Sequence, residues 1–217
     1  MASNMTPIDE IMKAFRIELN IAPYGDGHIN DTFVADSTPR YILQRVNTSI
    51  FKNPDELMEN IVSVTEHLRN KIIAAGGNPD RETLTVINTR DNKPYYTAEN
   101  GNCYRVYKFI TNTISLNLPE NPYQFETSAK AFGRFQNMLA DFDASKLLET
   151  IPNFHHTPKR IEALKEAMDK NIAGRKDEVI DVYNEYMKFE EVCCSIQKGL
   201  DSGEIPLRVT HNDTKLN

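Results

Sequence analysis

Residues 24–34 have the sequence YGDGHINDTFV, which places two glycines in a short polar turn. The turn leads into residues 31–35, whose β-branched and aromatic side chains predict a strand. Residues 18–24 before the turn and 40–46 after it have the same character, and Ser37-Thr38-Pro39 is typical of a hairpin connection. A glycine-rich turn between antiparallel strands can cover nucleotide phosphates, as it does in kinases. The alternative is a plain hairpin turn, which two glycines by themselves favour.

Two other nucleotide motifs do not fit this turn. It does not precede a helix within a βαβ unit, so it does not indicate a dinucleotide site. It also lacks the Gly-Lys-Ser/Thr of a phosphate-binding P-loop. Asn30 stands where a third glycine would be, and asparagine tolerates a left-handed backbone.

A basic residue follows on the next strand, in Tyr41-Ile42-Leu43-Gln44-Arg45. We expect Arg45 to reach phosphate and to pair with a carboxylate on the following helix, while Gln44 points to the opposite face of the strand. The Asn53-Pro54 start and the apolar period predict that helix over residues 54–75. Glu59 is our candidate partner, and Glu56 is the alternative, although the helix cap can engage it. An ordinary surface ion pair is the other interpretation of Arg45.

The rest of the chain changes from strands to helices. Further strands are predicted at 83–88, near 94–98 and at 103–110, and helices from Asn121-Pro122, from Thr157-Pro158 and over 175–200. We therefore expect an α+β chain with two lobes. The N-lobe covers residues 1–110 and has an antiparallel sheet with one helix, residues 111–122 form a hinge, and 123–217 form a mostly helical C-lobe.

The last residues have the sequence THNDTKLN (210–217). An extended run that leads into His-x-Asp is typical of a phosphotransferase catalytic loop, in which Asp213 accepts the proton of the acceptor hydroxyl. Lys215 is placed to neutralise charge on the transferring phosphoryl group. His211 is expected to hold the loop in place. A polar tail is the alternative, and a metal site at these residues would need a third ligand that the sequence does not identify.

Charge and composition exclude several classes of protein. The chain has 217 residues, with 25 Lys and Arg against 31 Asp and Glu, a net charge of −6. This argues against a nonspecific nucleic-acid binder, which needs a basic surface. The three cysteines include an adjacent pair and do not indicate a disulfide framework. No apolar run approaches the ~20 residues that cross a bilayer. We expect a cytoplasmic protein without membrane or nucleic-acid partners.

Taken together and in this order, the motifs resemble those of the aminoglycoside/choline kinase superfamily, and most closely those of N-acetylhexosamine 1-kinases. The stretches that carry the resemblance are YGDGHINDTFV (24–34), YILQRVN (41–47), FKNPDELMENI (51–61), FGRFQNML (132–139), IPNFHHTPKR (151–160) and THNDTKLN (210–217). The resemblance implies a protein-kinase-like two-lobe fold. It also implies transfer of phosphate from ATP, with Mg²⁺, to a sugar hydroxyl, here the anomeric hydroxyl of an N-acetylhexosamine.

The resemblance also implies roles for individual residues. Asp213 becomes the catalytic base, with Lys215 and His211 beside it. The nucleotide residues are Gly25, Asp26, Gly27 and His28 in the turn, Arg45 in place of the strand lysine, Glu59, and Lys108 and Ile110 in the segment that faces adenine. Phe154, His155 and Arg160 are expected near the sugar, although this run can equally serve to begin the third helix.

In this family the metal-binding Asn lies five residues after the catalytic Asp, whereas Asn217 lies four after Asp213. We therefore expect the metal ligands to lie beyond Asn217 and the chain to be an N-terminal portion with little activity of its own. Choline, an aminoglycoside, homoserine and methylthioribose remain alternative acceptors. A noncatalytic nucleotide-binding fragment is the alternative from another class. The sequence does not predict an oligomeric state.

Overall fold

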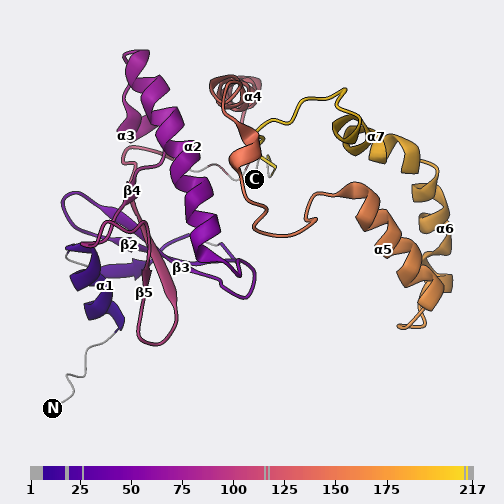
Figure 1. Ribbon diagram of the computed structural model, residues 1–217, viewed down its shortest axis with the longest axis horizontal. Helices are drawn as coiled ribbons and strands as arrows, with labels where there is room; N and C mark the ends of the chain where they lie inside the picture. Colours follow the sequence, from indigo (N-terminus) through magenta and orange to yellow (C-terminus); the bar gives the residue numbers. More distant parts are fainter. Residues whose placement is uncertain are drawn as a thin grey trace. The chain divides into compact units, whose positions relative to one another are not determined.

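The computed structural model describes residues 7–17, 20–25, 27–114, 116, 118–212 and 214. Its residues form two compact units (Figure 1). The first contains the chain up to Thr150 and again from Arg208 onward, and the second contains Ile151–Leu207. The segments on either side of the predicted hinge at 111–122 thus belong to the same unit. The division into lobes at that hinge stays a prediction.

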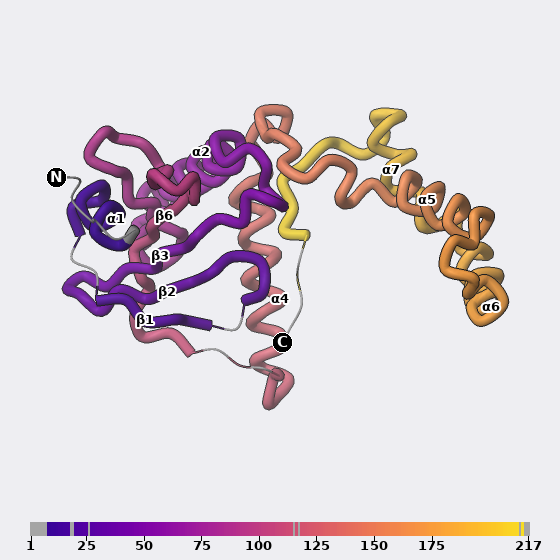
Figure 2. Tube along the Cα trace, turned by 90° about the horizontal axis from the view of Figure 1, so that it is seen from below, coloured from indigo at the N-terminus to yellow at the C-terminus, as the bar shows by residue number. Residues whose placement is uncertain are grey.

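An antiparallel sheet lies at the centre of the first unit, and Figure 2 shows β1, β2 and β3 side by side. The strand order is β1-β2-β3-β6-β4, with β5 paired to β6. The bounds are β1 Ile21–Pro23, β2 Asp31–Ala35, β3 Tyr41–Val46, β4 Val86–Ile87, β5 Tyr96–Thr97 and β6 Cys103–Lys108. The predicted α+β class with an antiparallel N-terminal sheet is confirmed. The strands predicted at 83–88 and 94–98 are shorter than expected.

The two faces of the sheet are covered by different helices. Helix α1 (Pro7–Phe15) packs on the face that carries Leu43 and Val106. Helix α2 (Pro54–Ala74) packs through Leu57 on the opposite face, against Val46 and Cys103. Because side chains alternate along a strand, these contacts determine which face each residue of β3 and β6 occupies.

Helix α2 begins as its sequence predicts. The side chain of Asn53 accepts a hydrogen bond from the backbone N–H of Glu56, at 3.4 Å, and Pro54 occupies the first helical position. A short helix that the sequence did not predict, α3 (Pro79–Glu82), follows. It begins in the same way, because the Asn78 side chain accepts from Asp80 N.

Helix α4 (Pro122–Met138) packs beside the second half of α2, and a short 3₁₀ turn, η1 (Ala144–Lys146), follows it. Leu139, which is 1% exposed, joins Leu68 and Ile72 of α2 in a small core. The apolar residues that recur at helical spacing on α4 are only partly buried, and Phe125 at the start of the helix is 54% exposed. The apolar period predicts one face of a helix correctly, but it does not give the length of the surface that covers that face.

The second unit contains α5 (Thr157–Lys170), α6 (Lys176–Met187) and α7 (Glu190–Asp201). The single helix predicted over 175–200 is therefore wrong. Bonds of the tighter i→i−3 type, from Lys188 N to Glu185 O and from Phe189 N to Tyr186 O, interrupt it. Several large apolar side chains of α6 and α7 are exposed, including Val182 at 73%.

Candidate functional site

The glycine-rich turn joins β1 to β2 and needs glycine at only one of its two positions. Gly25 has a left-handed backbone with φ of 76°, which L side chains rarely adopt. Gly27 does not have a positive φ, and a Cβ added there would meet nothing within 4 Å. Asp26 lies outside the described residues, and His28 is exposed. Asn30, in the place of a third glycine, does not have a positive φ, and its Oδ1 accepts a hydrogen bond from Asn47 N at 3.0 Å.

The turn lies beside the segment predicted to face adenine. Tyr24, at the start of the turn, packs edge-on against Phe109, with ring centroids 5.7 Å apart and an interplanar angle of 76°. The guanidinium of Arg40 lies over the same Phe109 ring, 4.5 Å from its centroid. Phe109 N–H donates to Arg40 O at 3.0 Å. The structure therefore brings together the two elements that the sequence assigns to nucleotide.

Arg45 does not pair with the helix carboxylate that we predicted. Its Nε donates to Oδ2 of Asp31 on β2 at 2.5 Å, and the two side chains are 47% and 50% exposed. Arg45 shares the α1 face of the sheet with Leu43, whereas α2, which carries Glu59, covers the other face. The sheet therefore separates Arg45 from Glu59. A carboxylate on the neighbouring strand is simply the nearer partner.

The opposite face carries a row of three polar side chains across adjacent strands. Thr32, Gln44 and Arg105 are direct register partners on β2, β3 and β6. Gln44 Nε2 donates to Thr32 Oγ1 at 3.0 Å, and Arg105 Nε donates to Gln44 Oε1 at 3.0 Å. Because Thr32 is the second residue after the glycine-rich turn, this row runs from the turn to the central strand.

Arg105 is the most buried basic residue that the structure describes, with 8% of its surface exposed. Its Nη1 is buried and has no hydrogen-bond partner among the described residues. No described carboxylate lies within ion-pair distance of it. Its Cζ lies 5.4 Å from the ring centroid of Tyr107, within the range of a cation–π contact. Burial raises the pKa of the Tyr107 phenol, and the charge of Arg105 opposes that rise.

Lys108, which we expected beside the nucleotide, has its side chain engaged elsewhere. Its Nζ lies 2.7 Å from Asp80 Oδ2, and Arg69 Nη1 lies 3.0 Å from Asp80 Oδ1. The hydrogen bond from Lys108 and then that from Arg69 lower the pKa of Asp80 below its ordinary value. This cluster fixes the end of β6 against α3.

The backbone after Lys108 also has partners of its own. Ile110 O accepts from Thr113 Oγ1 at 3.2 Å, and Thr111 O accepts from Arg81 Nη1 at 2.7 Å. The N–H of Lys108 donates to Thr85 O at 3.0 Å. The roles of Lys108 and Ile110 toward adenine stay predictions.

Residues 208–211, which lead into Asp213, belong to the first unit and contact α4 and the residues that follow it. Arg208 Nη1 donates to Ala140 O at 2.9 Å, and the partly buried Val209 packs against the core between α2 and α4. The predicted extended run at 207–210 forms no strand, because it pairs with this core instead of the sheet. The Thr210 hydroxyl donates to Asn212 Oδ1 at 2.7 Å and shapes the following turn. Asp213 and Lys215 lie outside the described residues.

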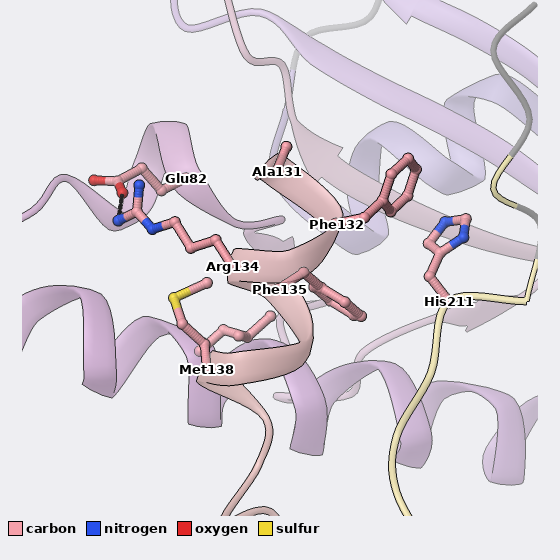
Figure 3. Close-up of a pocket in the computed structure, with 8 residues that line it drawn as sticks. Glu82, Ala131, Phe132, Arg134, Phe135, Met138 and His211 are labelled. Carbon is pink, nitrogen blue, oxygen red and sulfur yellow. Dashed lines mark hydrogen bonds and ion pairs between the residues drawn. The ribbon is translucent and has the colours of Figure 1, made fainter. Parts of the chain in front are cut away.

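His211 is held by aromatic side chains of α4. The centroid of its ring lies 5.3 Å from the ring centroid of Phe132 and 6.3 Å from that of Phe135, and both contacts are edge-on. Figure 3 shows both phenylalanines extending from α4 toward His211, while Arg134 points away to Glu82, with which it forms an ion pair of 2.7 Å. The role of His211 in holding the loop stays a prediction.

A pocket of about 390 Å³ lies at this contact between α2, α3, α4 and the returning segment (Figure 3). Its lining is mostly apolar and consists of Leu68, Glu82, Ala131, Phe132, Arg134, Phe135, Met138 and His211. The volume is in the range of small-molecule sites.

The predicted sugar residues lie in the second unit and contact one another. Arg160 Nε donates to Phe154 O at 2.6 Å, and its Cζ lies 5.2 Å from the Phe154 ring centroid. The Phe154 and His155 rings are edge-on at 4.7 Å. His156 Nδ1 accepts from Lys159 N and caps α5, which is the alternative interpretation of this run. Their role toward a sugar stays a prediction.

No group of three or more His, Cys, Asp and Glu residues among those that the structure describes is placed to hold a metal ion. Within the same residues, none of the helices combines the length and the apolar character that crossing a bilayer needs.

Sequence reasoning missed Arg105 and the row that leads to it. The available signal was an arginine at the centre of the otherwise apolar run Cys103–Tyr107. A charged side chain within a central strand is rarely buried without a partner. Alternation alone did not help, because residues 103–107 are all buried and both faces of β6 are covered.

No protein-family model matches this chain. Among solved structures, the fold is similar to that of an aminoglycoside phosphotransferase from Alicyclobacillus acidocaldarius, with 14% identity and a TM-score of 0.46 over 88% of this chain. It is also similar to a spectinomycin phosphotransferase crystallised with ADP and spectinomycin, with 13% identity and a TM-score of 0.43 over 94% of this chain. This chain spans 55% and 65% of the lengths of those two proteins. What it does has to follow from its own residues.

Proposed function

We propose that this protein is an ATP-dependent phosphotransferase that phosphorylates a hydroxyl group of a small molecule. One observation carries the proposal. The chain leaves the first unit at Thr150 and returns at Arg208, so that Val209 and His211, which precede Asp213 in the sequence, lie in the same compact unit as the strands β1 and β2 on either side of the glycine-rich turn. A polar tail would need neither the packing of Val209 against a hydrophobic core nor the contacts of the His211 ring with Phe132 and Phe135. Both are expected where a catalytic loop has to be held in place.

The reaction assigns a task to each motif. Asp213 takes the proton of the acceptor hydroxyl, the acceptor oxygen bonds to the γ-phosphorus, and the bond from that phosphorus to ADP breaks. Lys215 stabilises the charge on the transferring group. Mg²⁺ bound with ATP would supply neutralisation of the phosphate charge, and we assign none of the described residues to it.

The first acceptor that we propose is an N-acetylhexosamine, phosphorylated at its anomeric hydroxyl. Its support is the sequence similarity in YILQRVN, NFHHTPKR and HNDTKLN. Choline is less favoured, because its ammonium is usually held by an aromatic cage and the chain has no tryptophan. Aminoglycosides, homoserine and methylthioribose are the remaining acceptors to test.

The test is an acceptor screen with radiolabelled ATP, using the 217-residue chain and, in parallel, the longest polypeptide that its gene encodes. Phosphate transfer to an N-acetylhexosamine, lost in Asp213→Asn, would support the full proposal. Transfer only to choline, an aminoglycoside or homoserine would contradict the sugar and keep the phosphotransferase. ATP binding without transfer to any acceptor, in both polypeptides, would indicate a noncatalytic nucleotide-binding protein and refute the proposal.

A further inference from the structure

We propose that Arg105 on β6, and not Arg45 on β3, is the basic residue that binds the phosphates of the nucleotide. The inference rests on the proposed function for the identity of the anion. It differs from the prediction made from the sequence, which assigned this task to Arg45 because of its place on the strand after the glycine-rich turn.

The guanidinium of Arg105 is buried without a negatively charged partner among the residues that the structure describes. Arg105 is 8% exposed, its Nη1 lacks a hydrogen-bond partner, and no described carboxylate balances its charge. A buried charge is normally paired, because removing it from water is costly. A buried donor left unsatisfied in a folded protein needs an explanation, and an anionic ligand is one that matches both the charge and the missing acceptor.

The Arg105 side chain is already held in place before a ligand binds. Its Nε donates to Gln44, and Gln44 donates to Thr32, so hydrogen bonds across three strands fix the guanidinium. With Nε engaged, the Nη1 that lacks a partner among the described residues remains for a ligand, and a guanidinium suits phosphate oxygens because its donors form a planar fork.

Arg105 is also connected to the glycine-rich turn. The row of Thr32, Gln44 and Arg105 ends at Thr32, the second residue of the strand that follows the turn, so the row connects this strand to Arg105. Arg45, by contrast, lies on the α1 face, half exposed and already paired with Asp31. A phosphate at Arg45 would have to displace the carboxylate of Asp31. A phosphate at Arg105 would supply the negative charge and the hydrogen-bond acceptor that this guanidinium lacks.

The test compares Arg105→Gln with the matched control Arg45→Gln in the full chain, using ATP, inorganic tripolyphosphate and adenosine as probes in calorimetry. We expect Arg105→Gln to weaken ATP and tripolyphosphate binding by about 10- to 100-fold, the loss of one charged hydrogen bond, and to leave adenosine unchanged. Arg45→Gln should change each dissociation constant by less than about threefold.

A second measurement separates this role from a merely structural one. Without ligand, Arg105→Gln should melt at the same temperature as the wild type or higher, because a neutral amide removes an uncompensated buried charge. If Arg105→Gln fails to fold, the Nε–H resonance of Arg105 in the wild type, assigned with Arg105→Lys, must shift on titration with tripolyphosphate.

The outcomes distinguish the two proposals. ATP binding by the wild type that Arg105→Gln leaves intact, or that Arg45→Gln weakens more, overturns the role of Arg105 alone. A resonance that does not shift overturns it as well. A wild-type chain that binds neither ATP nor tripolyphosphate overturns the proposed function and this inference with it.

Discussion

Replacing Gly27 with alanine is expected to weaken ATP binding without lowering stability, whereas replacing Gly25 is expected to lower stability. Gly25 has φ of 76°, where a Cβ costs about 1–2 kcal/mol. Gly27 lacks this conformation, and its Cβ would enter open space. Alanine there reduces the freedom of the unfolded chain, which favours folding by up to about 1 kcal/mol.

The effect on ATP follows from the close approach that a phosphate-binding turn requires. A methyl group between the backbone of Gly27 and a phosphate oxygen would break one charged hydrogen bond, which corresponds to about tenfold or more in the dissociation constant. Urea unfolding and calorimetry with ATP on the same preparations measure both quantities. Unchanged ATP affinity in Gly27→Ala would show that this turn is only a hairpin, and would refute its role in phosphate binding.

Two further predictions concern the supports of the site. Leu139→Ala should lower the free energy of unfolding by about 2–5 kcal/mol, because Leu139 is 1% exposed in the core that holds Val209; a loss under about 1 kcal/mol in urea unfolding would contradict this packing. The pKa of Asp80 is lower in the folded chain than in the unfolded chain, chiefly because of the hydrogen bond from Lys108. The ionised Asp80 therefore stabilises the fold above pH ~4, and this contribution is lost as the pH falls through the pKa of the folded state. Between about pH 5 and 3, the free energy of unfolding of the wild type should therefore fall more steeply than that of Asp80→Asn. The difference should be about 1 kcal/mol or less, because the Asp80–Lys108 pair is partly exposed. Parallel curves of unfolding free energy against pH for the two proteins would exclude the effect.

Local signals in the sequence predicted local structure well. The Asn53-Pro54 start of α2 and the strand over 31–35 were confirmed at the expected residues. Both depend on neighbours within a few residues, a cap in one case and a turn in the other. The break between α6 and α7 near Lys188 was missed, because no glycine or proline marks it and the apolar period continues across it.

The candidate site depended on information that is not local. Whether Arg45 meets Glu59 is decided by which face of the sheet α2 covers, and residue spacing along one strand does not contain that choice. The alternation rule correctly placed Gln44 and Arg45 on opposite faces. What it did not reveal was that the face of Gln44, and not that of Arg45, is the one covered by α2.

A physical reason favours a phosphate-binding cation in the position of Arg105. An exposed pair such as Arg45–Asp31 is worth about 0–1 kcal/mol, and both side chains are free to exchange partners with water. Arg105 lies on a central strand with neighbours on both sides, and its Nε is fixed by Gln44. Electrostatic attraction to an anion is stronger where water is excluded, and a fixed side chain loses little freedom on binding. The unpaired guanidinium lowers the stability of the unliganded fold. The unpaired guanidinium also makes Arg105 a selective site for an anion, because a bound phosphate would neutralise the buried charge and restore the lost stability.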